Sequence, residues 1–370
     1  MPTIAIDARM INHSGIGTYM KNLISVLLED YHLILLGAPL EIKKHIKSGY
    51  IEIINFQSPI YSVSEQMMYP LIIPGCDLLL STHYNIPLFP IRAKKRIVII
   101  YDANHLAFYN HLSIVQKLYT KLMMNGAVKL SDTIITISEF SKSEILKYLS
   151  VDPLKIKVVH FGIDPEMINL ELKKAPSRSL SIGNVDEKFL LFVGNVKPHK
   201  NLINLLRAFE ILLQSGKDYK LVIVGKKAGF ITGDKEVFEY IELNKLLKEN
   251  IIFTGHIENR ELYNYYRKAS VFIFPSLYEG FGIPPLEAMI CGCPVIASDL
   301  TAIPEICGDA VLYIKALDPA DIAEKINILT VDKSLRNELV KKGNLQVSKF
   351  PLTKFSHNLK EVIKEVINKG

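Results

Sequence analysis

The chain has 370 residues, 49% of them hydrophobic and 22% charged, which allows two to three globular domains and excludes a largely disordered protein. The formal net charge of +6 is mild and spread along the chain, so it does not indicate a nucleic-acid-binding protein. No apolar run approaches the roughly 18 residues that a membrane-spanning helix requires.

The first predicted elements are a strand, a loop with two glycines and a helix. Residues 4–6 are apolar, Gly15 and Gly17 follow, and an amphipathic run continues to residue 28. Glycines in such a loop let the backbone approach a phosphate or a sugar, with the helix N-terminus pointing at it. Met20 stands where a dinucleotide-binding fingerprint has its third glycine, which disfavours a nicotinamide-dependent oxidoreductase. Because the first residues lack the basic stretch of a signal peptide, we expect a cytoplasmic protein.

Short apolar runs then alternate with helical segments through the first half of the chain. The predicted strands cover residues 32–36, 51–54, 77–81, 96–101, 133–137 and 155–159. Because these runs do not alternate between apolar and polar residues, they predict a parallel sheet that helices cover on both faces. Ligands bind at the carboxyl ends of such strands, so Asp102, His105 and, after an earlier strand, His83 are candidate substrate-binding residues.

Residues 113–130 predict a long amphipathic helix with a basic side. Its apolar positions are Ile114, Val115, Leu118, Leu122 and Met123, and its basic positions are Lys117, Lys121 and Lys129. A helix of this type can lie on a membrane surface that holds a lipid-linked substrate. A helix that packs its apolar side chains into the core and exposes its lysines is more common, and we favour that interpretation.

The domain boundary is expected near the middle of the chain. Residues 166–186 show no sustained periodicity, so we expect a linker there, between a domain at residues 1–165 and a second domain at residues 187–354. The second domain opens with an apolar strand at residues 189–193, a glycine turn and a helix. Lys200 lies at the start of this helix, where its ammonium and the helix dipole would both attract a diphosphate.

A second glycine turn follows the predicted buried strand at residues 271–274. Two prolines come after this turn and suit the first turn of a helix, where a missing N–H costs nothing. The backbone amides of residues 280–283 then lie at the N-terminus of that helix, which favours an anion or a row of hydroxyl oxygens. Glu279 and Glu287 are eight positions apart, and both can line one crevice at the carboxyl end of the strand.

The turn and its surroundings read Glu279-Gly-Phe-Gly-Ile-Pro-Pro-Leu-Glu287, followed by Gly292-Cys-Pro-Val-Ile-Ala-Ser298. This stretch resembles the signature of the family 4 retaining glycosyltransferases. The resemblance implies an α/β GT-B fold, in which two Rossmann-like, doubly wound parallel-sheet domains face a central cleft and residues 355–370 cross back to the first domain. It also implies a nucleotide-diphosphate-sugar donor and retention at the anomeric carbon. Because the chain looks most like bacterial or archaeal mannosyltransferases of polysaccharide assembly, we expect transfer of a hexose, mannose first, to a glycan or lipid-linked acceptor.

The same resemblance implies roles for individual residues. Glu279, Lys200 and Asp102 are implied in catalysis, and Asp102 and His105 in binding the acceptor. The implied donor-binding residues come from several loops and are Gly15, Gly17, Asn195, Lys200, Gly255, His256, Ile257, Glu279, Gly280, Phe281, Gly282, Ile283 and Glu287.

Some positions depart from the family pattern, and one motif of other transferases is missing. Tyr101 stands where many members have a histidine, and Asn195 where many have an arginine. No two aspartates stand two positions apart, so the metal-holding Asp-x-Asp of the other major glycosyltransferase fold is absent. We therefore expect no metal and no other cofactor, and four cysteines without a paired metal-ligand pattern agree with that expectation.

Two alternatives of different classes share parts of this pattern. A GT-B-fold sugar-nucleotide epimerase would have the same sheets, and sugar release with and without an acceptor would distinguish it from a transferase. A non-catalytic sugar-nucleotide-binding subunit is the other alternative, against which the presence of Glu279, Glu287 and Lys200 argues. The expected partners are the sugar donor and the acceptor, and we expect no nucleic acid. The protein could also contact the inner face of a membrane peripherally.

Overall fold

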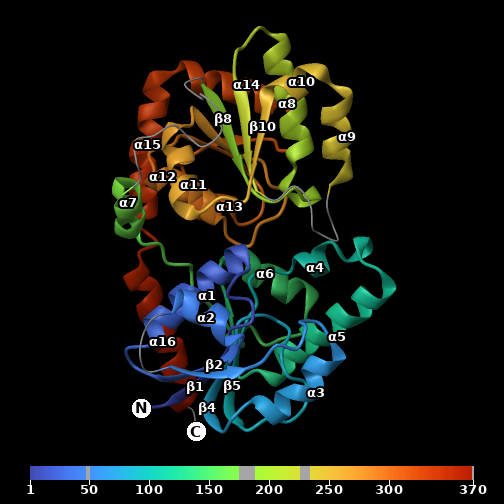
Figure 1. The fold of residues 1–370 in the computed structure, drawn as a ribbon, viewed down its shortest axis with the longest axis vertical. Helices are drawn as coiled ribbons and strands as arrows, with labels where there is room; N and C mark the ends of the chain where they lie inside the picture. The colour runs from blue at the N-terminus through green and yellow to red at the C-terminus, as the bar shows by residue number, and fades with distance from the viewer. Residues whose placement is uncertain (47–50, 175–187, 226–233, 369–370) are drawn as a thin grey trace. The chain divides into compact units, whose positions relative to one another are not determined.

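The computed structural model describes residues 1–46, 51–174, 188–225 and 234–368, which form two compact units (Figure 1). Unit 1 comprises Met1–Gly162 together with Leu352–Gly370, and unit 2 comprises Ile163–Pro351. The division falls close to the boundaries expected from the sequence at residues 165 and 355. The expected cleft between the two domains stays a prediction.

Unit 1 is built on a seven-stranded sheet in the order β3-β2-β1-β4-β5-β6-β7. Its strands are β1 (Thr3–Asp7), β2 (His32–Gly37), β3 (Ile51–Asn55), β4 (Cys76–Ser81), β5 (Ala93–Ile99), β6 (Thr133–Thr136) and β7 (Ile156–Val158). All neighbouring pairs are parallel. The central strands are buried along most of their length, as the uninterrupted apolar runs predicted.

Helices connect these strands and cover the sheet. They are α1 (Ser14–Leu27), α2 (Pro39–His45), α3 (Val63–Ile72), α4 (Asn104–Ala107), α5 (Ile114–Leu130) and α6 (Glu139–Tyr148). The last helix of the chain, α16 (Leu352–Asn368), also belongs to unit 1 and packs against α1. Phe355 of α16 lies 5.3 Å from the ring of Tyr19, and a Cβ at Gly162 would lie 2.5 Å from the Phe355 Cβ, so this glycine permits the contact.

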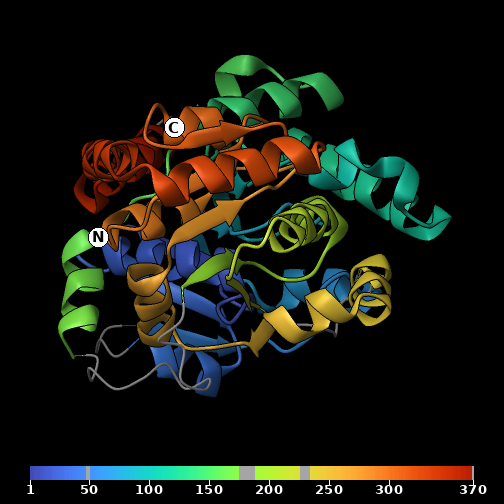
Figure 2. The ribbon, with the colours of Figure 1, turned by 90° about the horizontal axis from the view of Figure 1, so that it is seen from above.

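Unit 2 is built on a six-stranded parallel sheet in the order β10-β9-β8-β11-β12-β13. Its strands are β8 (Phe189–Val193), β9 (Lys220–Val224), β10 (Ile251–Gly255), β11 (Val271–Phe274), β12 (Val295–Ser298) and β13 (Leu312–Ile314). Helices α8 (Leu202–Gln214), α9 (Lys235–Leu243), α10 (Lys245–Asn250) and α14 (Pro319–Val331) pack together, and so do α11 (Asn259–Lys268), α12 (Ile283–Ile290) and α15 (Lys333–Val347). Figures 1 and 2 show helices on both sides of the sheet. The two parallel, doubly wound sheets confirm the predicted fold class.

Part of the expected linker is helical. Helix α7 (Pro165–Lys174) occupies the first half of residues 166–186, and it contacts α11 and α12 within unit 2. Ile168 and Leu172, four positions apart, are buried and anchor the helix, which explains why the segment is ordered. The remainder, 175–187, lies outside the described residues.

Each sheet reverses its strand order at one place, and this reversal positions the loops that carry the candidate site residues. In unit 2 the order reverses between β8 and β11, and in unit 1 between β1 and β4. The loops that follow such a strand pair run to opposite sides and leave a crevice at the carboxyl ends of the strands, where open α/β sheets bind ligands. In unit 2 these loops carry Lys200 and Glu279.

Candidate functional site

Lys200 and Glu279 meet at the strand reversal of unit 2. Lys200 ends the short 3-10 helix η3 (Pro198–Lys200) after β8, and Glu279 lies on the turn after β11. The Lys200 Nζ donates a hydrogen bond of 2.6 Å to the Glu279 Oε1, and both side chains are largely shielded from solvent, at 20% and 14% exposed. The Nζ also lies 5.6 Å from the centre of the Phe274 ring. A lysine and a glutamate that were predicted separately therefore form one paired charge site.

The two loops that carry this pair are fastened to each other. The Leu277 amide donates to the His199 carbonyl at 2.8 Å. The buried Asn201 side chain donates to the carbonyls of Pro275, at 3.0 Å, and Ala316, at 2.6 Å. Asn201 itself has φ +57°, a left-handed conformation that asparagine tolerates better than most residues. These bonds hold the Lys200 and Glu279 loops in one geometry before any ligand binds.

The glycine turn after β11 leads directly into helix α12. Gly282 has φ +109° and forms the N-cap, and the two prolines follow in the first turn, as predicted. Phe281 is buried against Phe350, with ring centres 5.7 Å apart, while the Glu279 amide donates to Thr301 Oγ1 at 3.2 Å. The amides of Gly282 and Ile283 thus lie at a helix N-terminus close to Glu279 in the chain, and those of Gly280 and Phe281 lie in the turn just before it.

Glu287 lies farther along α12 and faces helix α11. The Tyr266 hydroxyl donates to the Glu287 Oε2 at 3.4 Å. Burial raises the pKa of the Glu287 carboxyl to about 7, and the hydrogen bond from Tyr266 opposes this shift. Among the described residues, no hydrogen bond or ion pair joins Glu287 to Lys200 or Glu279. The two glutamates of the signature therefore have different environments, one paired with a cation and one hydrogen-bonded to a tyrosine hydroxyl.

The remaining glycine turns of unit 2 converge at the same edge of the sheet. The Gly194 amide donates to the Val224 carbonyl, and the Gly225 amide to the Gly255 carbonyl at 3.0 Å. A Cβ at Gly225, which has φ +150°, would lie 2.1 Å from the Gly194 carbonyl oxygen. The predicted residues Asn195, His256 and Ile257 follow these turns. Gly225 was not among the predicted site residues, although its position directly after an apolar strand was a usable signal.

The two predicted glycines of unit 1 are in the first turn of α1, where a loop was expected. A Cβ at Gly17 would lie 2.3 Å from the Ile11 carbonyl oxygen, so close backbone packing requires glycine there. Gly15 has open space around its Cα. The loop between β1 and α1 is therefore shorter than the sequence suggested, because the helix begins at Ser14.

The acceptor candidates of unit 1 lie at the carboxyl ends of β4 and β5. The Asp102 Oδ1 accepts a hydrogen bond from the Asn104 amide at 2.9 Å, and His105 is exposed on α4. The His105 ring lies edge-on to Tyr84, which stacks on His83 with ring centres 4.0 Å apart. Burial is the main cause that lowers the pKa of His83 to about 3, so this imidazole is neutral at physiological pH. The structure brings all three candidates to one edge, but their roles stay predictions.

Sequence reasoning missed a buried charge network at the strand reversal of unit 1. The Arg9 guanidinium bonds to the Asp7 carboxylate at 2.6 Å and to the Glu65 carboxylate, and it lies 4.1 Å from the centre of the Phe56 ring. Tyr69 donates to the Asp7 Oδ2 at 2.9 Å. A signal existed, because Asp7 ends the first strand and Arg9 comes two positions later.

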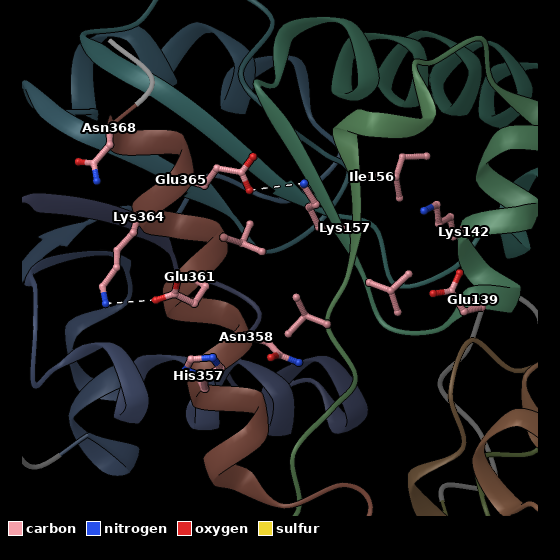
Figure 3. Close-up of a pocket in the computed structure, with 13 residues that line it drawn as sticks. Glu139, Lys142, Ile156, Lys157, His357, Asn358, Glu361, Lys364, Glu365 and Asn368 are labelled. Carbon is pink, nitrogen blue, oxygen red and sulfur yellow. Dashed lines mark hydrogen bonds and ion pairs between the residues drawn. The ribbon is translucent and has the colours of Figure 1, made fainter.

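A surface groove in unit 1 contains none of the predicted site residues. This groove of about 840 Å³ lies between α6, β7 and α16, and Figure 3 shows Lys157 of β7 pointing at Glu365 of α16. Their charged atoms are 3.4 Å apart. Within the described residues, no three His, Cys, Asp or Glu side chains gather to hold a metal ion, and the expectation of a metal-independent reaction stays a prediction. Every helix in the described residues is too short or too polar to span a lipid bilayer.

Two family models match successive parts of the chain. The model described as Glycosyltransferase Family 4 matches residues 13–167, and the model described as Glycosyl transferases group 1 matches residues 178–346. The chain belongs to the family 4 glycosyltransferases. The second match contains Lys200, Glu279 and Glu287, so the paired charge site lies in the part that resembles the group 1 model.

Curated relatives agree with this glycosyltransferase family, and solved structures share its fold. O-antigen chain mannosyltransferase B of Escherichia coli is 28% identical over 238 residues, and O-antigen chain mannosyltransferase RfbU of Salmonella typhimurium 29% over 241 residues. These matches cover 63% and 65% of this chain but only 60% and 61% of the relatives. The crystal structure of Anabaena HepE in complex with UDP and glucose is 17% identical, with a TM-score of 0.76 over 99% of this chain and 100% of that one. Sucrose-phosphate synthase of Thermosynechococcus elongatus is 16% identical with the same TM-score over 100% of both chains; these likenesses show the shared GT-B fold.

Proposed function

We propose that this chain is a retaining glycosyltransferase that moves a hexose from a nucleoside-diphosphate sugar to a hydroxyl group of a glycan or lipid-linked acceptor. The observation that carries the proposal is the contact between Lys200 and Glu279 at the strand reversal of unit 2. This contact places the Lys200 ammonium near the N-terminus of α12, and the Glu279 carboxylate lies next to both of them. A sugar diphosphate offers the matching chemistry, with anionic phosphates at one end and hydroxyl groups at the other.

In this mechanism Lys200 and the amides of Gly280–Ile283 receive the diphosphate. Negative charge develops on the β-phosphate oxygens as the bond to the sugar breaks, and donors that are already in position stabilise it. Lys200 then exchanges part of its contact with Glu279 for a phosphate oxygen. The fastening of the two loops through His199 and Asn201 keeps this reorganisation small.

Glu279 orients the sugar, and Glu287 receives the ribose hydroxyl groups of the nucleotide. The acceptor hydroxyl attacks the anomeric carbon from the same face that the leaving group departs from, and its proton passes to the departing phosphate. Because attack and departure occur on one face, the anomeric configuration is retained. Asp102 and His105 on unit 1 are the proposed acceptor contacts. The reaction requires no metal in this proposal, since Lys200 and the helix amides supply the positive charge.

GDP-mannose is the first donor to test, because two matched relatives are named mannosyltransferases. UDP-hexoses are the second, because a structural neighbour was crystallised with UDP and with UDP-glucose. Thermal unfolding of the full chain with each nucleotide sugar identifies the donor, since a ligand at about 100 times its Kd adds roughly 2.7 kcal/mol of stability. A panel in which no nucleotide sugar raises the Tm would contradict the proposal.

Turnover then distinguishes the transferase from its alternatives. We expect sugar to appear in a new glycoside when an acceptor is present, with the α- or β-configuration of the donor preserved in the product. An epimerase would release altered sugar without any acceptor, and a non-catalytic subunit would bind the donor and leave it intact. Nuclear magnetic resonance of the product's anomeric proton reports the configuration.

A further inference from the structure

Helix α5 exposes an apolar face that the sequence analysis assigned to the core. Ile114, Val115, Leu118 and Leu122 are between 59% and 77% exposed, whereas Met123 is buried as expected. The opposite side of the helix, with Met124, Ala127 and Val128 beside Met123, fills the core of unit 1. The favoured interpretation of a core-facing helix is therefore wrong for four of the five apolar positions. The helix is apolar on both sides, and one of the two apolar sides has no cover within the described residues of the chain.

Helix α3 repeats this arrangement next to it. Val63, Met67 and Leu71, spaced at four residues, are 62–81% exposed, while Glu65 and Tyr69 of the same helix are buried. The segment that follows β4 joins the two helices. Gln66 of α3 bonds to the Ile86 carbonyl and the Leu88 amide, and the Leu88 side chain reaches the position that a Cβ would take at Gly126 of α5.

A hydrogen-bond network joins α3 to α5. Asn85 donates to Glu65 of α3 and accepts a hydrogen bond from Tyr119 of α5. Tyr61, just before α3, packs edge-on against Tyr119 with ring centres 5.9 Å apart. We call the exposed apolar side chains of the two helices the α3–α5 face; Figure 1 shows both helices in the same part of unit 1.

Charge indicates what covers this face. Helix α5 carries Lys117, Lys121 and Lys129 and contains no aspartate or glutamate along its 17 residues. The one carboxylate of α3, Glu65, is buried and bonded to Arg9. The exposed charged side chains of the two helices are therefore all lysines. An exposed apolar strip with lysines is complementary to a surface that is apolar inside and negatively charged outside, and an anionic lipid bilayer has that character.

We propose that the α3–α5 face docks unit 1 onto an anionic lipid surface, with the apolar side chains of α3 and α5 inserted among the lipids and the α5 lysines against the headgroups. The proposal does not depend on the sugar-transfer reaction. It would, however, place the protein where a lipid-linked acceptor is held.

Flotation of the full chain with lipid vesicles tests the proposal. Vesicles of phosphatidylcholine with an equal amount of phosphatidylglycerol are compared with vesicles of phosphatidylcholine alone. We expect binding to the anionic vesicles, weakened by added salt because the lysine contribution is screened, and little binding to the neutral ones. The double substitution Leu118→Glu with Leu122→Glu should lower the partition coefficient at least about tenfold, because two inserted apolar side chains become charged.

A matched control uses two exposed leucines of unit 2. Leu243→Glu with Leu345→Glu makes the same chemical change at positions that are 89% and 69% exposed, and it should leave vesicle binding unchanged. Circular dichroism and the Tm of each variant show that both remain folded. Unchanged flotation of the α5 variant, or equal binding of the wild type to neutral vesicles, would overturn the proposal. A dimer in light scattering that Leu118→Glu with Leu122→Glu dissociates would also overturn it, since the face would then bind a second copy of the chain.

Discussion

The Lys200 ammonium lies 2.6 Å from the Glu279 carboxylate, although the two residues are 79 positions apart in the chain. Each is the ionic partner of the other in a place with little access to water. Removing one of them therefore does more than delete a contact, because it leaves an opposite charge without its partner in that setting. This coupling determines how variants at either position should behave.

Lys200→Ala should lower both donor affinity and turnover, with kcat/KM falling roughly a hundredfold, because a preorganised cation at the departing phosphate is lost. Lys200→Arg should retain part of the activity, since it keeps the charge. Steady-state kinetics with the identified donor measures both. Lys248→Ala is the control, because Lys248 also pairs with a glutamate, at 2.5 Å, but on the exposed surface. Equal kinetics for Lys200→Ala and the control would contradict the assignment.

Glu279→Ala should reduce kcat by a factor on the order of a hundred, because a correctly held sugar is a large part of transition-state positioning. The double variant with Lys200→Ala should lose less than the sum of the two single effects in free energy, since the residues act as a pair. Measuring kcat/KM for the wild type, the two single variants and the double variant gives a double-mutant cycle. Near wild-type turnover in Glu279→Ala would remove this residue from the site.

Glu287→Gln should make stability less dependent on pH. The pKa of Glu287 rises from 4.5 to about 7 on folding, so between these values the folded protein keeps a proton that the unfolded chain has released. The free energy of unfolding therefore falls as the pH rises through this window, and the loss persists above it. The glutamine variant lacks this loss, so its stability relative to wild type should be higher at pH 8 than at pH 5.

Urea unfolding at the two pH values measures the effect. Glu324→Gln on α14 is the control, because it removes one carboxylate by the same chemical change at an exposed position. Wild type and Glu287→Gln with parallel pH curves would show that Glu287 titrates at its ordinary pKa.

Gly225→Ala should destabilise unit 2 and weaken donor binding. Its new Cβ would collide with the Gly194 carbonyl oxygen, 2.1 Å away, and force the turns after β8 and β9 apart. Gly216→Ala provides a matched control, since Gly216 also has positive φ but open space around it, and it should cost only the left-handed backbone strain of about 1–2 kcal/mol. Thermal unfolding and donor titration compare the two. A Gly225 variant no worse than the Gly216 variant would exclude the predicted collision.

Arg9→Met should lower the free energy of unfolding by about 3–5 kcal/mol, because Asp7 and Glu65 would lose the cation between them. Adding Glu65→Gln removes one of the two unpaired carboxylates and should restore part of the loss. Urea unfolding of wild type, the single variant and the double variant measures this. If Glu65→Gln worsens the Arg9 variant, repulsion between the carboxylates is not the cause of the loss.

The sequence was informative where local pattern alone determines structure. Apolar runs such as residues 189–193 and 271–274 became buried parallel strands, and the glycine–proline turn after Glu279 became a helix start. Lys200 was predicted beside a helix N-terminus because a glycine turn and a helix follow a strand in order. Its contact with Glu279 could not be predicted in detail, since it depends on the adjacency of β8 and β11.

The remaining features depend on tertiary packing. Helix α5 is apolar on two sides, so periodicity alone could not decide which side, with Leu118 or with Met124, would meet the core. The pKa of Glu287 depends on burial against α11, a helix that begins 28 positions earlier in the sequence at Asn259. Arg9 bonds to Glu65 only because the chain returns through α3 to the end of β1.

The attachment of α16 to unit 1 has a consequence for how the protein is made. Unit 2 is one continuous stretch, Ile163–Pro351, whereas unit 1 needs Leu352–Gly370 as well as Met1–Gly162. During translation the strands of the first sheet leave the ribosome early. The α16 residues that are buried in the folded unit leave it only after all of unit 2; they include Phe355, Leu359 and Ile363. The portion synthesised first is therefore the last to be completed, and in the meantime its uncovered apolar surface would be a substrate for chaperones.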